Sequence, residues 1–198
     1  MKLATQKIEI YRNLLKKDLL RICPSLNANE LELLAQKTTL AQFSKNEIII
    51  NAGSYSDKVY FIIKGMVRIF YVKENKEITN VLLAESSVLA GSYSFITGNK
   101  NFSTYQAIEK TIALYITNED LEELYQKHHS IEHLGRLIIE QYYAKFMKKT
   151  YDILFLSAEE RYTTFVNNHP ELLNRIPLKY IASYLGIAQA TLSRLRAK

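Results

Sequence analysis

The chain has 198 residues, of which 47% are hydrophobic and 23% charged, and its formal net charge is +6. This is the composition of an ordinary globular protein with one large domain or two small ones. Its longest apolar runs, such as Val59–Ile63 and Leu137–Ile139, are too short to cross a bilayer, and its first residues lack a signal-peptide core. The single cysteine, Cys23, excludes an internal disulfide and any metal site built from four cysteines of one chain. We therefore expect a cytoplasmic protein with no membrane partner and no cofactor.

The first segment, residues 8–36, is predicted to be helical. Apolar residues from Ile8 to Leu19 recur at helix spacing, and Pro24 and Ser25 then break the pattern. Asn27 can cap a second short helix, because Glu30 stands three residues later in a pattern typical of a capping box.

From Phe43 to about Ile116 the pattern changes to short strands. β-branched and aromatic runs alternate with glycine and asparagine turn residues, which favours a barrel, roll or sandwich. The predicted strands are Ile48–Ile50, Val59–Ile63, Val67–Val72, Ile78–Leu83 and Ala113–Ile116.

Helix returns after the strands, first near Asn118 and then over a longer stretch from Ile131 to near Leu154. The apolar residues of the longer helix form two adjoining stripes, one for the β-region and one for a second copy of the chain. The residues predicted for that dimer contact are Ile131, Leu134, Ile138, Tyr142 and Phe146. The alternative is a helix buried wholly within its own chain.

Positive charge is concentrated at the C-terminal end. From Lys145 to Lys198 there are nine basic and four acidic residues, so this quarter carries most of the net charge. A basic block suggests a polyanionic partner, either nucleic acid or an acidic membrane face. Ordinary solubilising lysines are the alternative, and charge alone does not decide between them.

The strongest local signal lies between Ile176 and Arg196. Pro177 suits the first turn of a helix whose inner face is Leu178, Ile181 and Leu185. Gly186 follows where that helix must stop and turn, because glycine accepts the left-handed conformation. A short helix, a glycine turn and a second helix form the helix-turn-helix pattern of DNA-binding proteins.

The second of these helices has a small, polar and basic outer surface. Leu192 and Leu195 define its inner face, and no acidic residue follows Glu171, whereas an ordinary amphipathic helix would mix acids with lysines there. Small residues allow close approach to the major groove, and arginine and glutamine reach base edges or phosphates. The predicted DNA-binding residues are Gln189, Ala190, Thr191, Ser193, Arg194, Arg196 and, on the first helix, Lys179.

With these motifs in view, the chain resembles the Crp/Fnr family of bacterial transcription regulators over nearly its whole length. The matching segments are Ala52–Ser54, Val59–Gly65, Val67–Ile69, Ile181–Ile187 and Thr191–Leu195. The resemblance implies an α+β fold: a jelly-roll-like β-roll (about 40–117) of the cyclic-nucleotide-binding type, flanked by helices, then a long dimerisation helix and a C-terminal winged helix-turn-helix. It divides the chain into a sensor domain (1–125), a dimerisation helix (126–154) and a DNA-binding domain (155–198).

The same resemblance implies a homodimer that binds a palindromic site on double-stranded DNA, with RNA polymerase as a further partner. It assigns base reading to Gln189, Ala190 and Arg194, and a phosphate contact to Thr191. Arginine in particular can bind guanine O6 and N7 in bidentate fashion. A protein of this kind is not an enzyme.

The effector region departs from the family pattern. Members that bind a cyclic nucleotide carry a Gly-Glu pair and, about ten residues later, an Arg-Ser or Arg-Thr pair, which this chain lacks. An anionic phosphate in a partly desolvated pocket without a charge partner is costly. We therefore expect an effector other than cyclic AMP, or none. The tentative effector pocket comprises Gly91, Ser92, Tyr93, Asn101, Phe102 and Ser103.

Two alternative functions remain at this point. The chain could be a small-molecule-binding sensory module whose helix-turn-helix does not bind DNA. It could also be a cupin-like metal enzyme, although its four histidines (His128, His129, His133 and His169) all lie outside the predicted strands. The short segment Asn167–Arg175 also leaves open whether the C-terminal domain has a β-wing.

Overall fold

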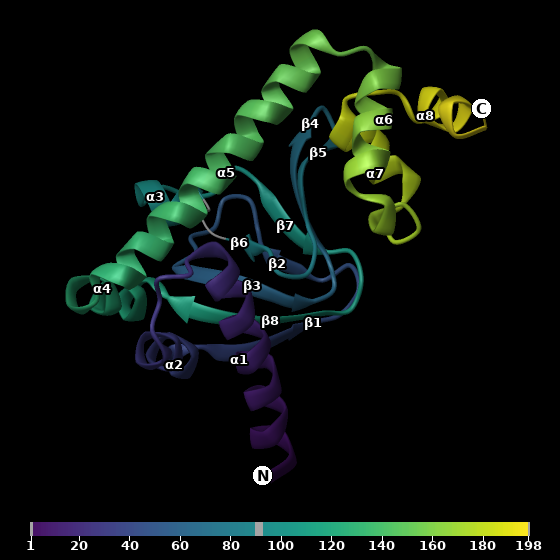
Figure 1. Cartoon of the computed structure of the whole chain (residues 1–198). Coiled ribbons are helices and arrows are strands. Elements are labelled where there is room, and N and C mark those ends of the chain that lie inside the picture. Colours follow the sequence, from purple (N-terminus) through teal and green to yellow (C-terminus); the bar gives the residue numbers. More distant parts are fainter. Residues whose placement is uncertain (1, 90–92, 198) are drawn as a thin grey trace.

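The computed structural model describes residues 2–89 and 93–197. A β-roll lies at its centre, two helices cover one side, and a long helix leads across the roll to a group of short helices at the C-terminal end (Figure 1). The N-terminal helices are α1 (Lys2–Ile22) and α2 (Ala28–Lys37). The predicted capping box is confirmed: the Asn27 side chain accepts from the Glu30 N–H at 3.0 Å, and the Glu30 carboxylate accepts from the Asn27 N–H at 3.0 Å.

Eight strands build the roll as two four-stranded antiparallel sheets, in the orders β1-β8-β3-β6 and β2-β7-β4-β5. Their bounds are β1 Thr39–Phe43, β2 Ile48–Ile50, β3 Lys58–Lys64, β4 Val67–Lys73, β5 Lys76–Leu83, β6 Val88–Leu89, β7 Thr104–Ala107 and β8 Thr111–Thr117, with a short helix, α3, at Tyr93–Thr97. All five predicted strands are confirmed. The structure adds β1, β6 and β7, which lack an unbroken β-branched or aromatic run.

Strand β3 explains why the roll needs helices on its outer face. Its side chains alternate between the two faces of the sheet. Tyr60 and Ile62 enter the core between the sheets, whereas Val59 and Phe61 pack outward among residues of α1, α2, α4 (Asn118–Lys127) and α5 (His129–Phe155). A strand that is apolar on both faces requires cover on both, so the helices complete the fold.

Helix α5 corrects the predicted dimer contact. Ile131 and Leu134 are 0% and 2% exposed inside their own chain, and Ile138 packs against the same core. Tyr142 is half-buried on this side of the helix. Of the five predicted residues, Phe146 alone is exposed, with 57% of its surface accessible. Both stripes of the helix are apolar, and only the packing against α1, α4 and the roll decides which one is covered. The apolar residues left exposed on α5 are Ile139, Tyr143, Phe146, Met147, Tyr151, Ile153, Leu154 and Phe155.

The C-terminal group consists of α6 (Ala158–Asn168), a 3-10 turn (Pro170–Leu172), α7 (Leu178–Leu185) and α8 (Gln189–Ala197). Gly186 ends α7 with φ +65°, which is the left-handed turn that the sequence predicts. Phe165, Ile181 and Leu192 form the centre of a separate core, to which the roll contributes Met66 and Ile108. Residues 118–197 contain no β-strand, so the part of the C-terminal group that the structure describes has no β-wing.

Candidate nucleic-acid interface

Helix α8 lies at the outer edge of the molecule, with one face packed and the rest in solvent (Figure 1). Leu192 is fully buried and fixes the helix to the C-terminal core. Ala190, Ser193 and Arg194 are exposed and point away from Leu192, whereas Gln189 and Arg196 are exposed at the flanks and Thr191 is half-buried. The predicted DNA-binding residues of α8 therefore share one accessible surface, which we call the α8 outer face.

The arginines of the α8 outer face are available for an external partner. The Nε of Arg194 makes one long hydrogen bond, 3.4 Å, to the carbonyl oxygen of Ala190 on the preceding turn. Within residues 2–89 and 93–197, neither Arg194 nor Arg196 has an ion-pair partner. Lys179 is also exposed, on α7, where its Nζ lies 5.0 Å from the ring centroid of Tyr180. The charge on the α8 outer face itself is therefore positive.

Helix α7 is held against the roll by polar contacts. The Oγ of Ser183 accepts from the backbone N–H of Thr79 on β5 at 2.8 Å and donates to the carbonyl oxygen of Glu77 at 3.2 Å. Thr79 is fully buried, so this hydroxyl satisfies a backbone donor that has no access to water. The position of the helix pair relative to the roll is therefore set through α7.

Arg68, on β4, makes a second contact between the roll and α7 that the sequence did not reveal. Its guanidinium is 1% exposed and lies between the rings of Phe70, at 4.0 Å, and Tyr180, at 3.8 Å. It also donates to Gln106 at 2.8 Å and to Glu77 at 2.6 Å. An arginine among buried apolar strand residues is the signal that could have pointed to such a contact, since a buried charge needs partners.

A third contact joins the segment before α7 to the roll. The guanidinium of Arg175 binds both carboxylate oxygens of Glu85, at 2.8 and 3.0 Å, and also binds Glu109. Burial acts to raise the pKa of Glu85, but the hydrogen bonds from Arg175 and from the Gly65 N–H outweigh it, so the pKa of Glu85 is lowered. This ion pair therefore persists at neutral pH and weakens as the pH falls through the lowered pKa of Glu85.

The tentative effector pocket is only partly described, because Gly91 and Ser92 lie outside the described residues. Asn101 is buried and its side chain serves the fold, since it accepts from the Ser94 N–H and donates to the Ser54 carbonyl, both at 3.1 Å. Ser103 is likewise buried. Tyr93 and Phe102 are exposed, with ring centroids 4.6 Å apart. Asn101 therefore has a structural role that sequence reasoning missed, and the effector pocket at this place stays a prediction.

Two further features bear on the class of protein. No helix among the described residues is long and apolar enough to cross a membrane. The part of the chain that the structure describes also holds no group of three or more histidine, cysteine, aspartate or glutamate side chains arranged for a metal ion.

Comparison with known proteins shows which domain family and which regulators this chain is similar to. Residues 40–128 match the cyclic nucleotide-binding domain family. The chain is 41% identical over 70 residues to the global nitrogen regulator of Nostoc sp., a match covering 35% of this chain and 31% of that protein. It is 36% identical over 73 residues to the global nitrogen regulator of Synechococcus elongatus, covering 36% and 32%. The chain thus spans about a third of the length of the curated relatives it matches.

Solved structures share the fold over most of the chain. The c-di-GMP-responsive global regulator CLP of Xanthomonas campestris has a TM-score of 0.69 at 14% identity, covering 86% of this chain and 90% of that one. FixK2 of Bradyrhizobium japonicum has a TM-score of 0.69 at 18% identity, covering 81% and 83%.

The chain thus has a roll that matches the cyclic nucleotide-binding domain, joined by a long helix to a helix-turn-helix, and it shares this fold with CLP and FixK2. The family match covers the roll and the start of the long helix, and the likeness to the solved structures extends the shared fold to the C-terminal helices.

Proposed function

We propose that this protein is a sequence-specific DNA-binding transcriptional regulator that binds a palindromic site as a homodimer. The observation that carries the proposal is the α8 outer face, which is exposed, free of acidic residues and bears Arg194 and Arg196. A helix with small residues and two unpaired arginines fits the major groove, where arginine reads guanine and also contacts phosphate. Such a regulator works in the cytoplasm, and RNA polymerase is its expected further partner from the family resemblance.

The dimer part of the proposal rests on α5. The exposed residues Ile139, Tyr143 and Phe146 recur at spacings of four and three residues and form one apolar stripe on the helix, and Leu154 lies about two turns further along. A stripe of this kind is suited to pack against the same stripe of a second copy, as in a parallel coiled coil. Two copies related by a twofold axis would present two α8 outer faces to successive major grooves, which predicts the palindromic site.

The absence of a phosphate partner supports an effector other than cyclic AMP. The region from Tyr93 to Thr104 contains one basic residue, the exposed Lys100, and no arginine. A cyclic phosphate bound there would lose water without gaining a buried counter-charge. Calorimetric titration with cyclic AMP should therefore show no micromolar binding.

The function is tested by selecting bound DNA from a random pool with the full chain. We expect an enriched palindrome whose half-sites lie about one helical turn apart. A Tyr143→Asp variant should lose the palindrome, because the charge disrupts the α5 stripe, while the equally exposed control Tyr55→Asp should keep it. No enrichment at low salt would contradict DNA binding, because phosphate contacts are strongest there. Enrichment of the same palindrome by Tyr143→Asp would contradict the α5 dimer.

A further inference from the structure

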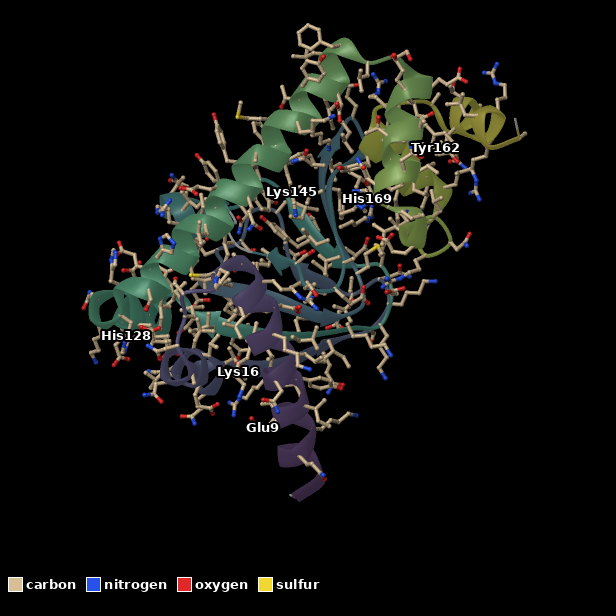
Figure 2. The ribbon with its side chains drawn as sticks, viewed as in Figure 1. Glu9, Lys16, His128, Lys145, Tyr162 and His169 are labelled. Atoms are coloured by element: carbon tan, nitrogen blue, oxygen red, sulfur yellow. The ribbon has the colours of Figure 1, made fainter. Side chains whose placement is uncertain are left out.

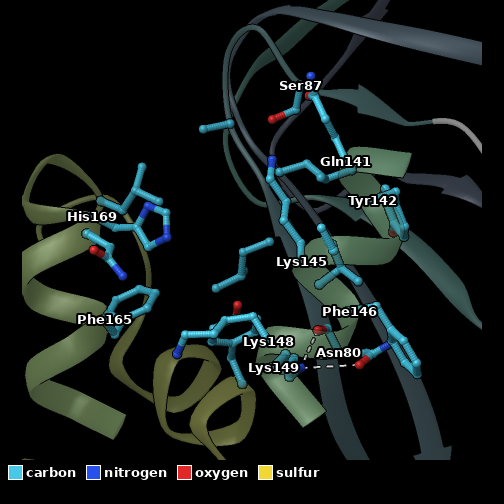
Figure 3. A pocket seen from close by; sticks show the side chains of 18 of the residues that line it. Asn80, Ser87, Gln141, Tyr142, Lys145, Phe146, Lys148, Lys149, Phe165 and His169 are labelled. Carbon is cyan, nitrogen blue, oxygen red and sulfur yellow. Dashed lines mark hydrogen bonds between the residues drawn. The ribbon is translucent and has the colours of Figure 1, made fainter. Parts of the chain in front are cut away.

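A deep cleft separates α5 from the C-terminal helices, with the edge of the roll as its third wall. It has a volume of about 720 Å³, and its walls come from residues 80–88 around the end of β5, from α5 and from α6 and α7. Figure 3 shows Tyr142, Lys145 and Phe146 on the α5 side and Phe165 and His169 on the other. This volume is in the range of sites that hold small organic molecules. The cleft is distinct from the tentative effector pocket near Phe102, since none of its lining residues lies between residues 89 and 137.

The lining of the cleft is mainly apolar. Aromatic and aliphatic side chains of the roll, of α5 and of the C-terminal helices meet there: Val81, Leu82, Leu83, Tyr142, Phe146, Ile153, Phe165, Leu172 and Leu185. An apolar part of a ligand placed in the cleft would therefore exchange contact with water for contact with apolar side chains, which is favourable.

Among the described residues, three basic groups of the cleft lining, Lys145, Lys149 and Arg161, have no ion-pair partner, whereas Lys148 pairs with Asp152. Lys149 Nζ donates to the side-chain oxygen of Asn80 at 3.2 Å and to the Asn80 carbonyl oxygen, and lies 4.2 Å from the ring centroid of Tyr184. All of these partners are neutral. Lys145 lies one turn earlier on the same face of α5 and has no ion-pair partner among the described residues. Figure 2 shows Lys145 and His169 on the two helices that flank the cleft.

Arg161, on α6, is the third basic residue of the lining that has no ion-pair partner among the described residues. One of its terminal nitrogens donates to the carbonyl oxygen of Leu156 at 2.6 Å, and its Nε is buried with no hydrogen-bond partner. A buried donor of this kind is uncommon in folded proteins and marks a place where a partner is missing.

The acidic residues of the cleft do not neutralise these groups. Glu85 is engaged by Arg175 and by the Gly65 N–H, and Asp152 is paired with Lys148. Glu171 is the remaining acid of the lining. The Lys149 ammonium therefore loses hydration without gaining an ion-pair partner, and burial lowers the pKa of this lysine to about 8. A bound anion would supply the counter-charge that the protein lacks.

We propose that this cleft is a binding site for a small organic anion that has an aromatic or aliphatic body and one acidic head. The head pairs with Lys145 and Lys149, and the body lies against Tyr142, Phe165 and Leu172. A ligand in this position contacts the roll, α5 and α6 together. Its binding energy therefore favours the arrangement in which the C-terminal helices are docked on the roll, because a ligand shifts an equilibrium toward the state it contacts best. The site does not depend on whether the α8 outer face binds DNA.

The test compares two fluorescent probes that share an apolar body. Anilinonaphthalene sulfonate carries a negative charge, whereas N-phenylnaphthylamine is neutral. We expect the full chain to bind both probes. A Lys145→Met/Lys149→Met variant should lose about tenfold or more in affinity for the sulfonate, because it lacks the charge-assisted contact to the anionic head. The neutral probe should bind this variant within about twofold of the wild-type affinity, because methionine keeps the apolar lining.

Three further variants make the result specific. Lys45→Met/Lys110→Met removes two exposed lysines far from the cleft lining and should bind the sulfonate like the wild type. Lys145→Met alone, which removes an exposed side chain without a partner, should fold normally and weaken the sulfonate about threefold or more. Ser87→Trp places a large ring in the cleft and should reduce the binding of both probes. The proposal would be overturned if Lys145→Met and the double variant bound the sulfonate with unchanged affinity. It would also be overturned if the double variant lost affinity equally for both probes, or if Ser87→Trp bound both probes like the wild type.

Discussion

The two helices of the C-terminal motif, α7 and α8, are next to each other in sequence and have opposite surroundings. Ile181 and Leu185 of α7 enter the C-terminal core, while Tyr180 and Ser183 contact the roll, so α7 is covered on two sides. Helix α8 is held through Leu192, and most of its surface faces solvent. The difference separates two roles within one motif: α7 fixes the orientation of the pair, and α8 carries the residues proposed to touch DNA. Substitutions on α7 should therefore change stability, and those on α8 should change binding.

The largest expected effect is on DNA affinity and comes from Arg194→Ala on the α8 outer face. Loss of a bidentate arginine–guanine contact should weaken binding by about 1–3 kcal/mol, or roughly fivefold to 150-fold, and relax preference at one base position. Arg196→Ala is the matched control, because a phosphate contact weakens binding evenly across sequences and lowers the salt slope by about 1. Fluorescence anisotropy with the selected palindrome and single-base variants measures both. An even loss across all base variants for Arg194→Ala would contradict its role in base reading.

A smaller effect, on folding stability, is expected from Ser183→Ala on α7. Removing the hydroxyl leaves the buried Thr79 N–H without its acceptor, which should lower the free energy of unfolding by about 1–2 kcal/mol. Ser193→Ala on α8 makes the same chemical change on an exposed surface, and its effect should stay within about 0.5 kcal/mol. Urea denaturation followed by circular dichroism gives both values. Equal effects of the two substitutions would show that α7 is no more firmly docked than α8.

The smallest effect concerns pH and Lys149, beside α7. Because burial lowers the pKa of Lys149 to about 8 from the ordinary 10.5, the unfolded state binds more protons between these values. The contribution of Lys149 to the unfolding free energy therefore rises with pH across this window, whereas below about pH 8 its burial penalty is present in full. Burial, with a smaller effect from the charge of Asp152, raises the pKa of the neighbouring Tyr184, whose contribution falls at still higher pH.

The difference between Lys149→Met and the wild type isolates this contribution from that of the tyrosines. The variant should be the more stable relative to wild type near pH 7.5, and its relative advantage should shrink by about 1 kcal/mol near pH 9.5. Lys110→Met provides the same replacement at an exposed site. Denaturant unfolding at the two pH values measures the change. A difference that stays constant between them would show that Lys149 titrates alike in the folded and unfolded states.

Local signals predicted much of the fold. The Asn27 cap, the strands from Ile48 to Leu83 and the Gly186 turn depend on residues a few positions apart, so the sequence pattern carries them directly. Strands β1, β6 and β7 escaped prediction because their residues become strands through pairing with distant segments, as Thr39 does with Tyr115. Ile131 and Leu134, predicted for the dimer contact, are buried within their own chain for a related reason, since two apolar stripes look alike until other elements cover one of them.

The candidate site divides in the same way. Helix spacing was enough to predict a helix-turn-helix with a polar, basic outer face, because Ile181, Leu185 and Leu192 must face the core and Arg194 then points outward. The place of this unit on the roll, and the residues beside it, depend on long-range packing. Ser183 meets Thr79 from 104 residues away, and Lys145 and Lys149 acquire their surroundings only when α6 and the roll close the cleft. The physical reason is that helix periodicity is a local property, whereas docking and desolvation depend on groups that the chain brings together only by folding.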